Sequence, residues 1–168
     1  SFIGFSAAFP LAIKVIFGFK HIVNSQGVSE HIINHNGPSA LTFAWIGPFL
    51  GALMRTIGGR VADKTGGAKI TQIVSLVMIA AVLGSAYFML EAYHSPTPEI
   101  FFWPFFWCFI VLFTASGIGN GSVFRSAAII FNQEQAGPVL GWISAVAAYG
   151  AFYIPQTFGE QIKTGTPQ

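Results

Sequence analysis

The chain has 168 residues, of which 53% are hydrophobic and only 8% are charged, and its mean hydropathy is +0.62. Soluble domains carry about 25% charged residues, so this chain could not cover a globule with polar surface, and its composition indicates an integral membrane protein. Eight basic and six acidic residues give a net charge of +2 with no basic stripe, which argues against a nucleic-acid partner.

The chain opens inside an apolar run, without an initiator Met, a basic leader or a small-residue cleavage site. No signal peptide is therefore expected, and we expect the sequence to be a fragment of a longer protein. Residues 2–19 predict a first membrane span, with Pro10 in its middle, where a proline frees a carbonyl group and kinks the helix. Lys14 and Lys20 lie toward the end of this span, and their side chains can reach the interface.

The most polar part of the chain follows at residues 20–38. It carries His21, His31 and His35, whose spacing fits no common metal-ligand pattern, and no cysteine lies near them. We therefore predict a loop with solvated histidines and no metal site.

The second span, residues 41–58, holds one charged residue, Arg55, well inside it. At about 1.5 Å per residue, Arg55 lies about 21 Å along the helix from Leu41 and about 12 Å short of Asp63. An arginine at depth in lipid costs roughly 2.5–3.5 kcal/mol even on the lenient insertion scale, so such residues usually face protein or a water-filled cavity. A functional role is favoured for Arg55, and snorkelling to the near surface is the alternative.

Three more spans are predicted at residues 70–90, 100–131 and 138–158. The fourth span begins with aromatic rings of the kind that collect where membrane meets water, which we interpret as anchoring: Phe101, Phe102, Trp103, Phe105, Phe106 and Trp107. The single cysteine, Cys108, can form no intrachain disulfide.

Lys and Arg residues near the span ends predict the orientation. Arg60, Lys64 and Lys69 follow the second span, whereas the link at 91–99 has no Lys or Arg. Basic residues concentrate in cytoplasmic loops, so loop 59–69 is expected to be cytoplasmic, although Lys20 argues mildly the other way. We therefore predict a multi-pass protein of the cell (inner) membrane, surrounded by the lipid bilayer.

A spaced pattern of glycines and charges connects the second and third spans: Gly59, Arg60, Asp63, Lys64, Gly66 and Gly67. Glycines permit a tight turn between closely packed helices. The Asp63 carboxylate can cap a helix or hold a neighbouring cation, latching the cytoplasmic side shut in one state. This pattern closely resembles the cytoplasmic loop motif of the major facilitator superfamily, and an ordinary basic membrane loop is the alternative.

Three spans sharpen the resemblance. The runs SGIGNGSVFR at 116–125, GWISAVAAYGAFYIP at 141–155 and SFIGFSA at 1–7 are similar to helices of the nitrate/nitrite porter family within that superfamily. The glycine run could also suggest a phosphate loop, but it lacks the Lys-Ser/Thr ending and follows no strand, so we reject a nucleotide site. The resemblance implies an all-α helical bundle of twelve helices in two halves, in which this chain supplies helices seven to eleven and needs the missing N-terminal half as partner.

The resemblance also implies a substrate site for nitrate and nitrite, without a cofactor. In that family one arginine from each half grips the planar anion, and Arg55 falls at the position of the C-terminal-half arginine. A guanidinium can align with a flat oxyanion through two parallel hydrogen bonds. Phe124 matches a family aromatic that stacks on the substrate. The other candidates lie on stretches expected to line the cavity: Gly119, Asn120, Gly121, Ser122, Ser144, Tyr149 and Gly150.

Coupling and exact substrate stay open at this point. Ala147 and Ala151 stand where the family usually has glycine, which leaves substrate and rate in question. No acid and no histidine lies in the middle of a span, so the chain offers no evident proton relay. We predict nitrate/nitrite exchange by alternating access. Proton-coupled nitrate symport, a facilitator porter for another small anion and a membrane ligand sensor are the alternatives, and no residue constellation indicates an enzyme.

Overall fold

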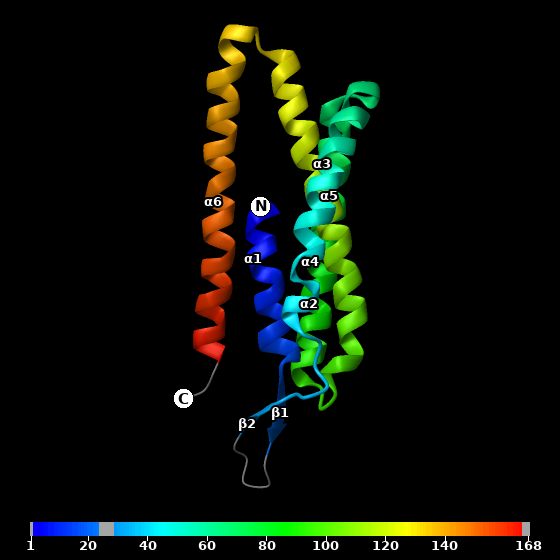
Figure 1. The fold of residues 1–168 in the computed structure, drawn as a ribbon, viewed down its shortest axis with the longest axis vertical. Coiled ribbons are helices and arrows are strands. Elements are labelled where there is room, and N and C mark those ends of the chain that lie inside the picture. Colours follow the sequence, from blue (N-terminus) through cyan, green and yellow to red (C-terminus); the bar gives the residue numbers. More distant parts are fainter. Residues whose placement is uncertain (1, 24–28, 166–168) are drawn as a thin grey trace.

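The computed structural model describes residues 2–23 and 29–165. α1 (Phe2–Ala12) continues into a π-helix, η1 (Ile13–Phe17), and the strands β1 (Phe19–Val23) and β2 (Ser29–Ile33) follow. The remaining elements are α2 (Ala40–Ala44), α3 (Ile46–Thr65), α4 (Gly67–His94), the 3-10 helix η2 (Pro98–Phe101), α5 (Phe102–Ile130) and α6 (Gln133–Gly165). The long helices lie roughly along one axis, with α6 at one edge beside α1 (Figure 1).

Within the part of the chain that the structure describes, four helical stretches are long and apolar enough to cross a membrane: Ala40–Thr65, Gly67–His94, Pro98–Ile130 and Glu134–Thr157. A shorter apolar helix covers Ile3–Phe17. Large apolar side chains on α4, such as Leu76 and Leu83, stay more than 60% exposed, which in water would be unfavourable and in lipid is expected. The predicted all-α membrane bundle is confirmed.

Phenylalanine rings from α1, η1 and α5 form the centre of the bundle. The buried members are Phe9, Phe17, Phe102, Phe105, Phe106, Phe109 and Phe113. The Phe9 ring centroid lies 4.9 Å from that of Phe109 and 5.7 Å from that of Phe113. Interpreting the whole aromatic start of the fourth span as an anchor was therefore wrong. The helical period turns one face of rings into the core and leaves Trp103 and Trp107 exposed.

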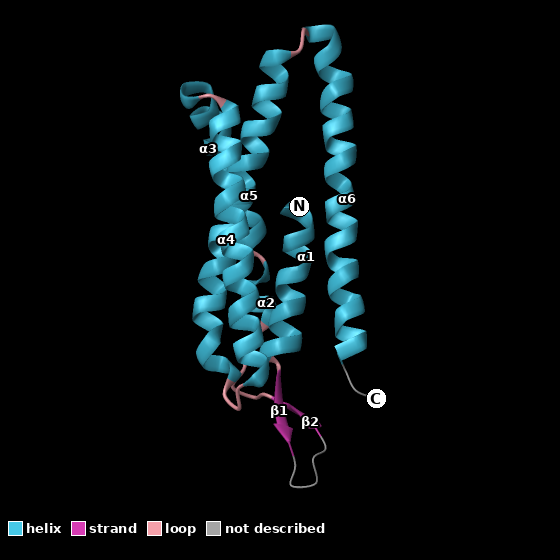
Figure 2. Ribbon diagram, turned by 180° about the vertical axis from the view of Figure 1, so that it is seen from behind, coloured by secondary structure: helices cyan, strands magenta, loops and turns pink. Residues whose placement is uncertain are grey.

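Part of the predicted loop at 20–38 belongs to the antiparallel pair of β1 and β2, which projects beyond the helix ends (Figure 2). Asn34 joins it to η1, because its Nδ2 donates to the Phe17 carbonyl at 3.1 Å and its backbone N–H donates to the Gly18 carbonyl at 2.9 Å. The His21 and His31 side chains lie outside the described part of the structure, and His35 is exposed. Among the described residues, no group of three or more His, Cys, Asp or Glu side chains could hold a metal ion.

The connection between α3 and α4 is shorter than the predicted loop. α3 continues to Thr65 and α4 begins at Gly67, so Gly66 alone separates the two helices. Gly66 has a φ of 88°, a left-handed conformation that residues with a Cβ rarely adopt. The glycine-rich segment is therefore mostly helical, and a single glycine reverses the chain.

Candidate functional site

Arg55 on α3 lies against an aromatic ring of α5. Its guanidinium carbon is 4.9 Å from the centroid of the Phe124 ring. A cation–π contact of this kind stabilises by about 0.5–1 kcal/mol at an exposed site and about 2 kcal/mol where water is excluded. Arg55 is exposed, and no described residue forms an ion pair or hydrogen bond with its side chain. Its N–H donors are therefore available to a ligand, while Phe124 restricts where the guanidinium can lie.

Glycines bring the α3 and α5 backbones into direct contact around this pair. A Cβ built at Gly117 would lie 2.5 Å from the Gly51 carbonyl oxygen, and a Cβ at Gly121 would overlap the Arg55 carbonyl oxygen. Real Cβ atoms essentially never approach backbone this closely, so these positions require glycine. Gly121, which contacts the Arg55 backbone, lies about one helical turn before Phe124 on α5. The contact therefore fixes the position of the Arg55 backbone relative to Phe124.

Asn120 lies one turn before Phe124 on α5, and residues four apart on a helix have Cβ atoms about 5–6 Å apart on one face. The Asn120 side chain is partly buried, and its Oδ1 is buried without a hydrogen-bond partner. Leaving a buried polar atom unpaired costs about 1–3 kcal/mol. Asn120 is thus a polar group that packing within this chain does not explain, beside the Arg55–Phe124 pair.

A second polar group lies where α3 turns into α4. The Arg125 Nε donates to Asp63 Oδ1 at 2.6 Å, and the two side chains are 53% and 39% exposed. On the same stretch of α5, the Ser122 hydroxyl donates to the Gly67 carbonyl at 3.0 Å. These contacts fasten the α3–α4 turn to α5. An open hollow of about 780 Å³ borders this group and does not include Arg55.

The other residues of the predicted cytoplasmic motif surround this turn. Arg60 and Lys64 are exposed, whereas a Cβ at Gly67 would overlap the Ser126 hydroxyl. A Cβ at Gly59 would lie 3.9 Å from the Gly121 carbonyl oxygen. The motif therefore combines glycines that allow close packing on α5 with charges that face outward.

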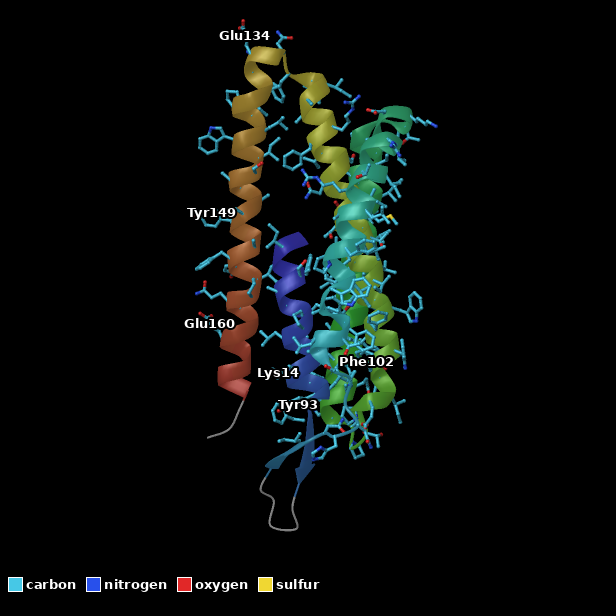
Figure 3. All side chains as sticks on the ribbon, viewed as in Figure 1. Lys14, Tyr93, Phe102, Glu134, Tyr149 and Glu160 are labelled. Carbon is cyan, nitrogen blue, oxygen red and sulfur yellow. The ribbon has the colours of Figure 1, made fainter. Side chains whose placement is uncertain are left out.

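Several predicted substrate residues do not meet Arg55 in this structure. Gly119 faces α4, since its Cβ would lie 3.1 Å from Val74 Cγ1, and the fully buried Ser122 is bonded to the start of α4. On α6, the Gly150 carbonyl lies against Gly4 of α1. Tyr149 is 78% exposed and points away from α1 (Figure 3), and the Ser144 hydroxyl donates to the Leu140 carbonyl at 2.8 Å.

Arg125 is the residue that the sequence analysis did not single out. It lies within the quoted run at 116–125, and its position near the same membrane face as Asp63 was the signal that could have identified it. Opposite charges at matching depths of two spans pair readily, because an unpaired charge near lipid is costly.

The comparisons with known proteins agree with one another. The probable nitrate/nitrite antiporter NarK2 of Thermus thermophilus is 37% identical over 152 residues, which cover 90% of this chain and 30% of that relative. The nitrate/nitrite transporter NarU of Escherichia coli strain K12 is 33% identical over 189 residues, which cover 99% of this chain and 36% of NarU. The chain belongs to the nitrate/nitrite porter family.

Membership of the porter family confirms the resemblance drawn from the motifs. The probable nitrate/nitrite transporter NarK2 of Mycobacterium tuberculosis strain H37Rv is a more distant relative, 26% identical over 161 residues. No family model matches the chain. The chain spans about a third of the length of these relatives. Their names describe transporters and not enzymes, and with the four membrane-length helices they make this chain part of a multi-pass integral membrane protein.

Proposed function

We propose that this chain is part of the C-terminal half of a nitrate/nitrite transporter and that Arg55 binds the transported anion. The observation that carries the proposal is an arginine in a membrane-length helix whose guanidinium lies on the Phe124 ring and has no acceptor among the described residues. An arginine at that depth is costly unless it meets an anion or water. The relatives are named nitrate/nitrite transporters or antiporters.

Nitrate suits this arrangement by its shape and charge. It is flat and monovalent, so a planar guanidinium can donate two parallel hydrogen bonds to two of its oxygens. The Phe124 ring would keep water from one side of the anion, which strengthens these charged hydrogen bonds. The N-terminal half would supply the second arginine and close the site from the opposite side. Alternating access then follows if the two halves rock about the bound anion.

The proposed mode is exchange of nitrate for nitrite. The acidic residues among the described ones lie in the hairpin, at helix ends or beyond the membrane-length stretches: Glu30, Asp63, Glu91, Glu99, Glu134 and Glu160, of which Figure 3 labels the last two. A proton-coupled porter needs a titratable group that protonates during the cycle, and such groups usually lie inside the membrane. In exchange, returning nitrite would neutralise the arginines in the return step, so no proton is required.

Counterflow in vesicles tests the transport mode. The full-length porter is reconstituted in liposomes, and nitrate uptake is measured with and without internal nitrite, at equal pH and with a pH gradient. Exchange predicts uptake that depends on internal nitrite at equal pH. Uptake that needs the pH gradient and ignores nitrite would instead establish symport, and nitrate binding without flux would indicate a ligand sensor.

Arg55→Lys tests the anion site itself. Lysine keeps the charge but loses the paired donors, so nitrate binding by the purified full-length porter is expected to fall at least about 10-fold, the loss of one charged hydrogen bond. Lys69→Arg, a charge-conserving change at an exposed position at the start of α4, is the matched control and keeps wild-type binding. Near-normal binding by Arg55→Lys would mean that Arg55 is structural.

We further propose that the Asp63–Arg125 pair stabilises the cytoplasmic end of this half. Both partners belong to this chain, and together with the Ser122–Gly67 bond they link α3, α4 and α5. The pair would keep these helices moving together. A contact that closes the cytoplasmic side would instead have to join this half to the other half of the transporter. The orientation with this turn in the cytoplasm follows from Arg60, Lys64 and Lys69.

A further inference from the structure

The Asn120 amide is a polar group in the bundle that the proposed function does not use. Its Oδ1 is buried without a partner, and no described residue hydrogen-bonds its Nδ2. Two serine side chains on α5 are satisfied: the Ser116 hydroxyl donates to the Phe113 carbonyl at 3.1 Å, and the Ser126 hydroxyl donates to the Ser122 carbonyl at 2.8 Å. Asn120 therefore differs from its neighbours on the same helix.

The position of Asn120 relative to Arg55 is well defined. α5 touches α3 through Gly117 and Gly121, and the Gly121 contact is with the backbone of Arg55 itself. Asn120 precedes Phe124 by one turn on the same face, and the Arg55 guanidinium lies over the Phe124 ring. An anion held by Arg55 against this ring would have Asn120 beside it along the α5 axis.

We infer that Asn120 makes the site prefer nitrate over nitrite, an inference that rests on the proposed function. Arg55 can hold two oxygens in parallel hydrogen bonds, and both anions have two oxygens. Nitrate has a third oxygen, which projects away from the arginine that holds the other two. An amide N–H one turn along α5 can donate to that oxygen, whereas nitrite offers only a nitrogen lone pair there, which is a weaker acceptor.

The neutral amide suits this role better than a charged group would. A lysine at position 120 would attract both anions, and a carboxylate would repel both. An uncharged donor adds little to the general attraction for anions, so its contribution depends on whether an acceptor oxygen is within reach. The unpaired Oδ1 is the cost of keeping a polar side chain at a place where an apolar one would pack without loss.

Asn120→Leu separates a role in the site from a role in packing. Leucine has nearly the same shape, and replacing an unpaired buried polar group by an apolar one is neutral or stabilising. The ligand-free variant is therefore expected to unfold at or above the wild-type temperature. Its nitrate affinity should fall about 10- to 100-fold, the range for a hydrogen bond to a charged group, while its nitrite affinity changes less than about threefold.

The measurement is calorimetric titration of the purified full-length porter with sodium nitrate and with sodium nitrite, together with thermal unfolding without anion. Ser116→Ala is the matched control, because it removes a satisfied hydroxyl one turn earlier on α5 and is expected to leave the nitrate-to-nitrite affinity ratio unchanged. Asn120→Ala is the second variant and should shift the affinity ratio in the same direction. It provides the test if a leucine at this position is not accommodated.

The outcomes separate this inference from the proposed function. One outcome is that the wild type binds both anions, Arg55→Lys does not, and the Asn120 variants keep the wild-type affinity ratio. Asn120 then does not determine the preference for nitrate, and the proposed function stands. An equal loss of both anions also overturns the inference, since it would indicate general damage to the site. If the wild type binds neither anion, the proposed function fails and the inference fails with it.

Discussion

Gly121→Ala is the sharpest test of how the site is built. A Cβ at this position would overlap the Arg55 carbonyl oxygen and would lie 3.0 Å from both the Arg55 carbonyl carbon and the Gly59 nitrogen. All three atoms are backbone, so no flexible side chain can move aside. α3 and α5 have to separate, and the Arg55 guanidinium shifts relative to the Phe124 ring, which it now approaches to 4.9 Å.

The magnitude follows from two opposing effects. In an unobstructed helix, alanine is more stable than glycine by roughly 0.5–1 kcal/mol. Overpacking of a close contact costs typically about 1–3 kcal/mol, so a net destabilisation is expected at position 121. Gly159→Ala is the matched control, because a Cβ there meets nothing within 4 Å on α6, and only the stabilising helix effect remains.

The assay is thermal unfolding of the two full-length variants in detergent, followed by nitrate titration of each. Gly121→Ala should unfold below the wild type and bind nitrate more weakly, while Gly159→Ala should unfold at or slightly above the wild type and bind normally. If Gly121→Ala matches Gly159→Ala in both measurements, the close contact of α3 with α5 does not position the anion site, and the reasoning from glycine packing is wrong.

Three further changes test individual contacts. Phe124→Leu keeps an apolar side chain but removes the ring under Arg55, so nitrate affinity should fall about 2- to 5-fold for a contact of about 0.5–1 kcal/mol; calorimetric titration measures this, and an unchanged affinity would show that the ring is dispensable. Asp63→Asn breaks an exposed ion pair worth no more than about 1 kcal/mol, so thermal stability should barely change while transport slows, and a large drop in stability would contradict this assignment. Ser122→Ala leaves the Gly67 carbonyl without its 3.0 Å hydrogen bond and should lower the unfolding temperature by an amount equivalent to about 1 kcal/mol, with nitrate affinity unchanged.

The membrane class and the positions of the long helices follow directly from hydropathy, because lipid demands long apolar helices whose backbone groups are satisfied internally. The juxtaposition of Arg55 with Phe124 was also implied by the family resemblance, and the structure brings these two side chains together. Finer assignments were limited by helix periodicity. Gly119 and Ser122 are neighbours of Asn120 in sequence, yet at 100° per residue they face α4 and not Arg55.

The hairpin and the α3–α4 turn could not be derived from the sequence for different reasons. The stretch at 20–38 is polar and carries two glycines, which predicts a loop. The pairing of the strands, such as Phe19 with Ile33, and the attachment of Asn34 to η1 cannot be derived from that composition. The connection was expected to cover residues 59–69 because its glycines were interpreted as residues of a turn between closely packed helices. The glycines at 58, 59 and 67 instead allow close packing on α5. Without knowing which helix lies beside them, glycines with this role cannot be distinguished from glycines of a loop.

The single-residue turn at Gly66 has a mechanical consequence. A connection of one residue leaves almost no freedom between the end of α3 and the start of α4, and the bonds from Asp63 and Gly67 to α5 remove much of what remains. Arg55 is therefore mounted on a stiff three-helix block. Any motion that carries the anion across the membrane has to displace this block as one piece, so spectroscopic labels on the outer faces of α3 and α4 should keep a constant separation throughout the cycle.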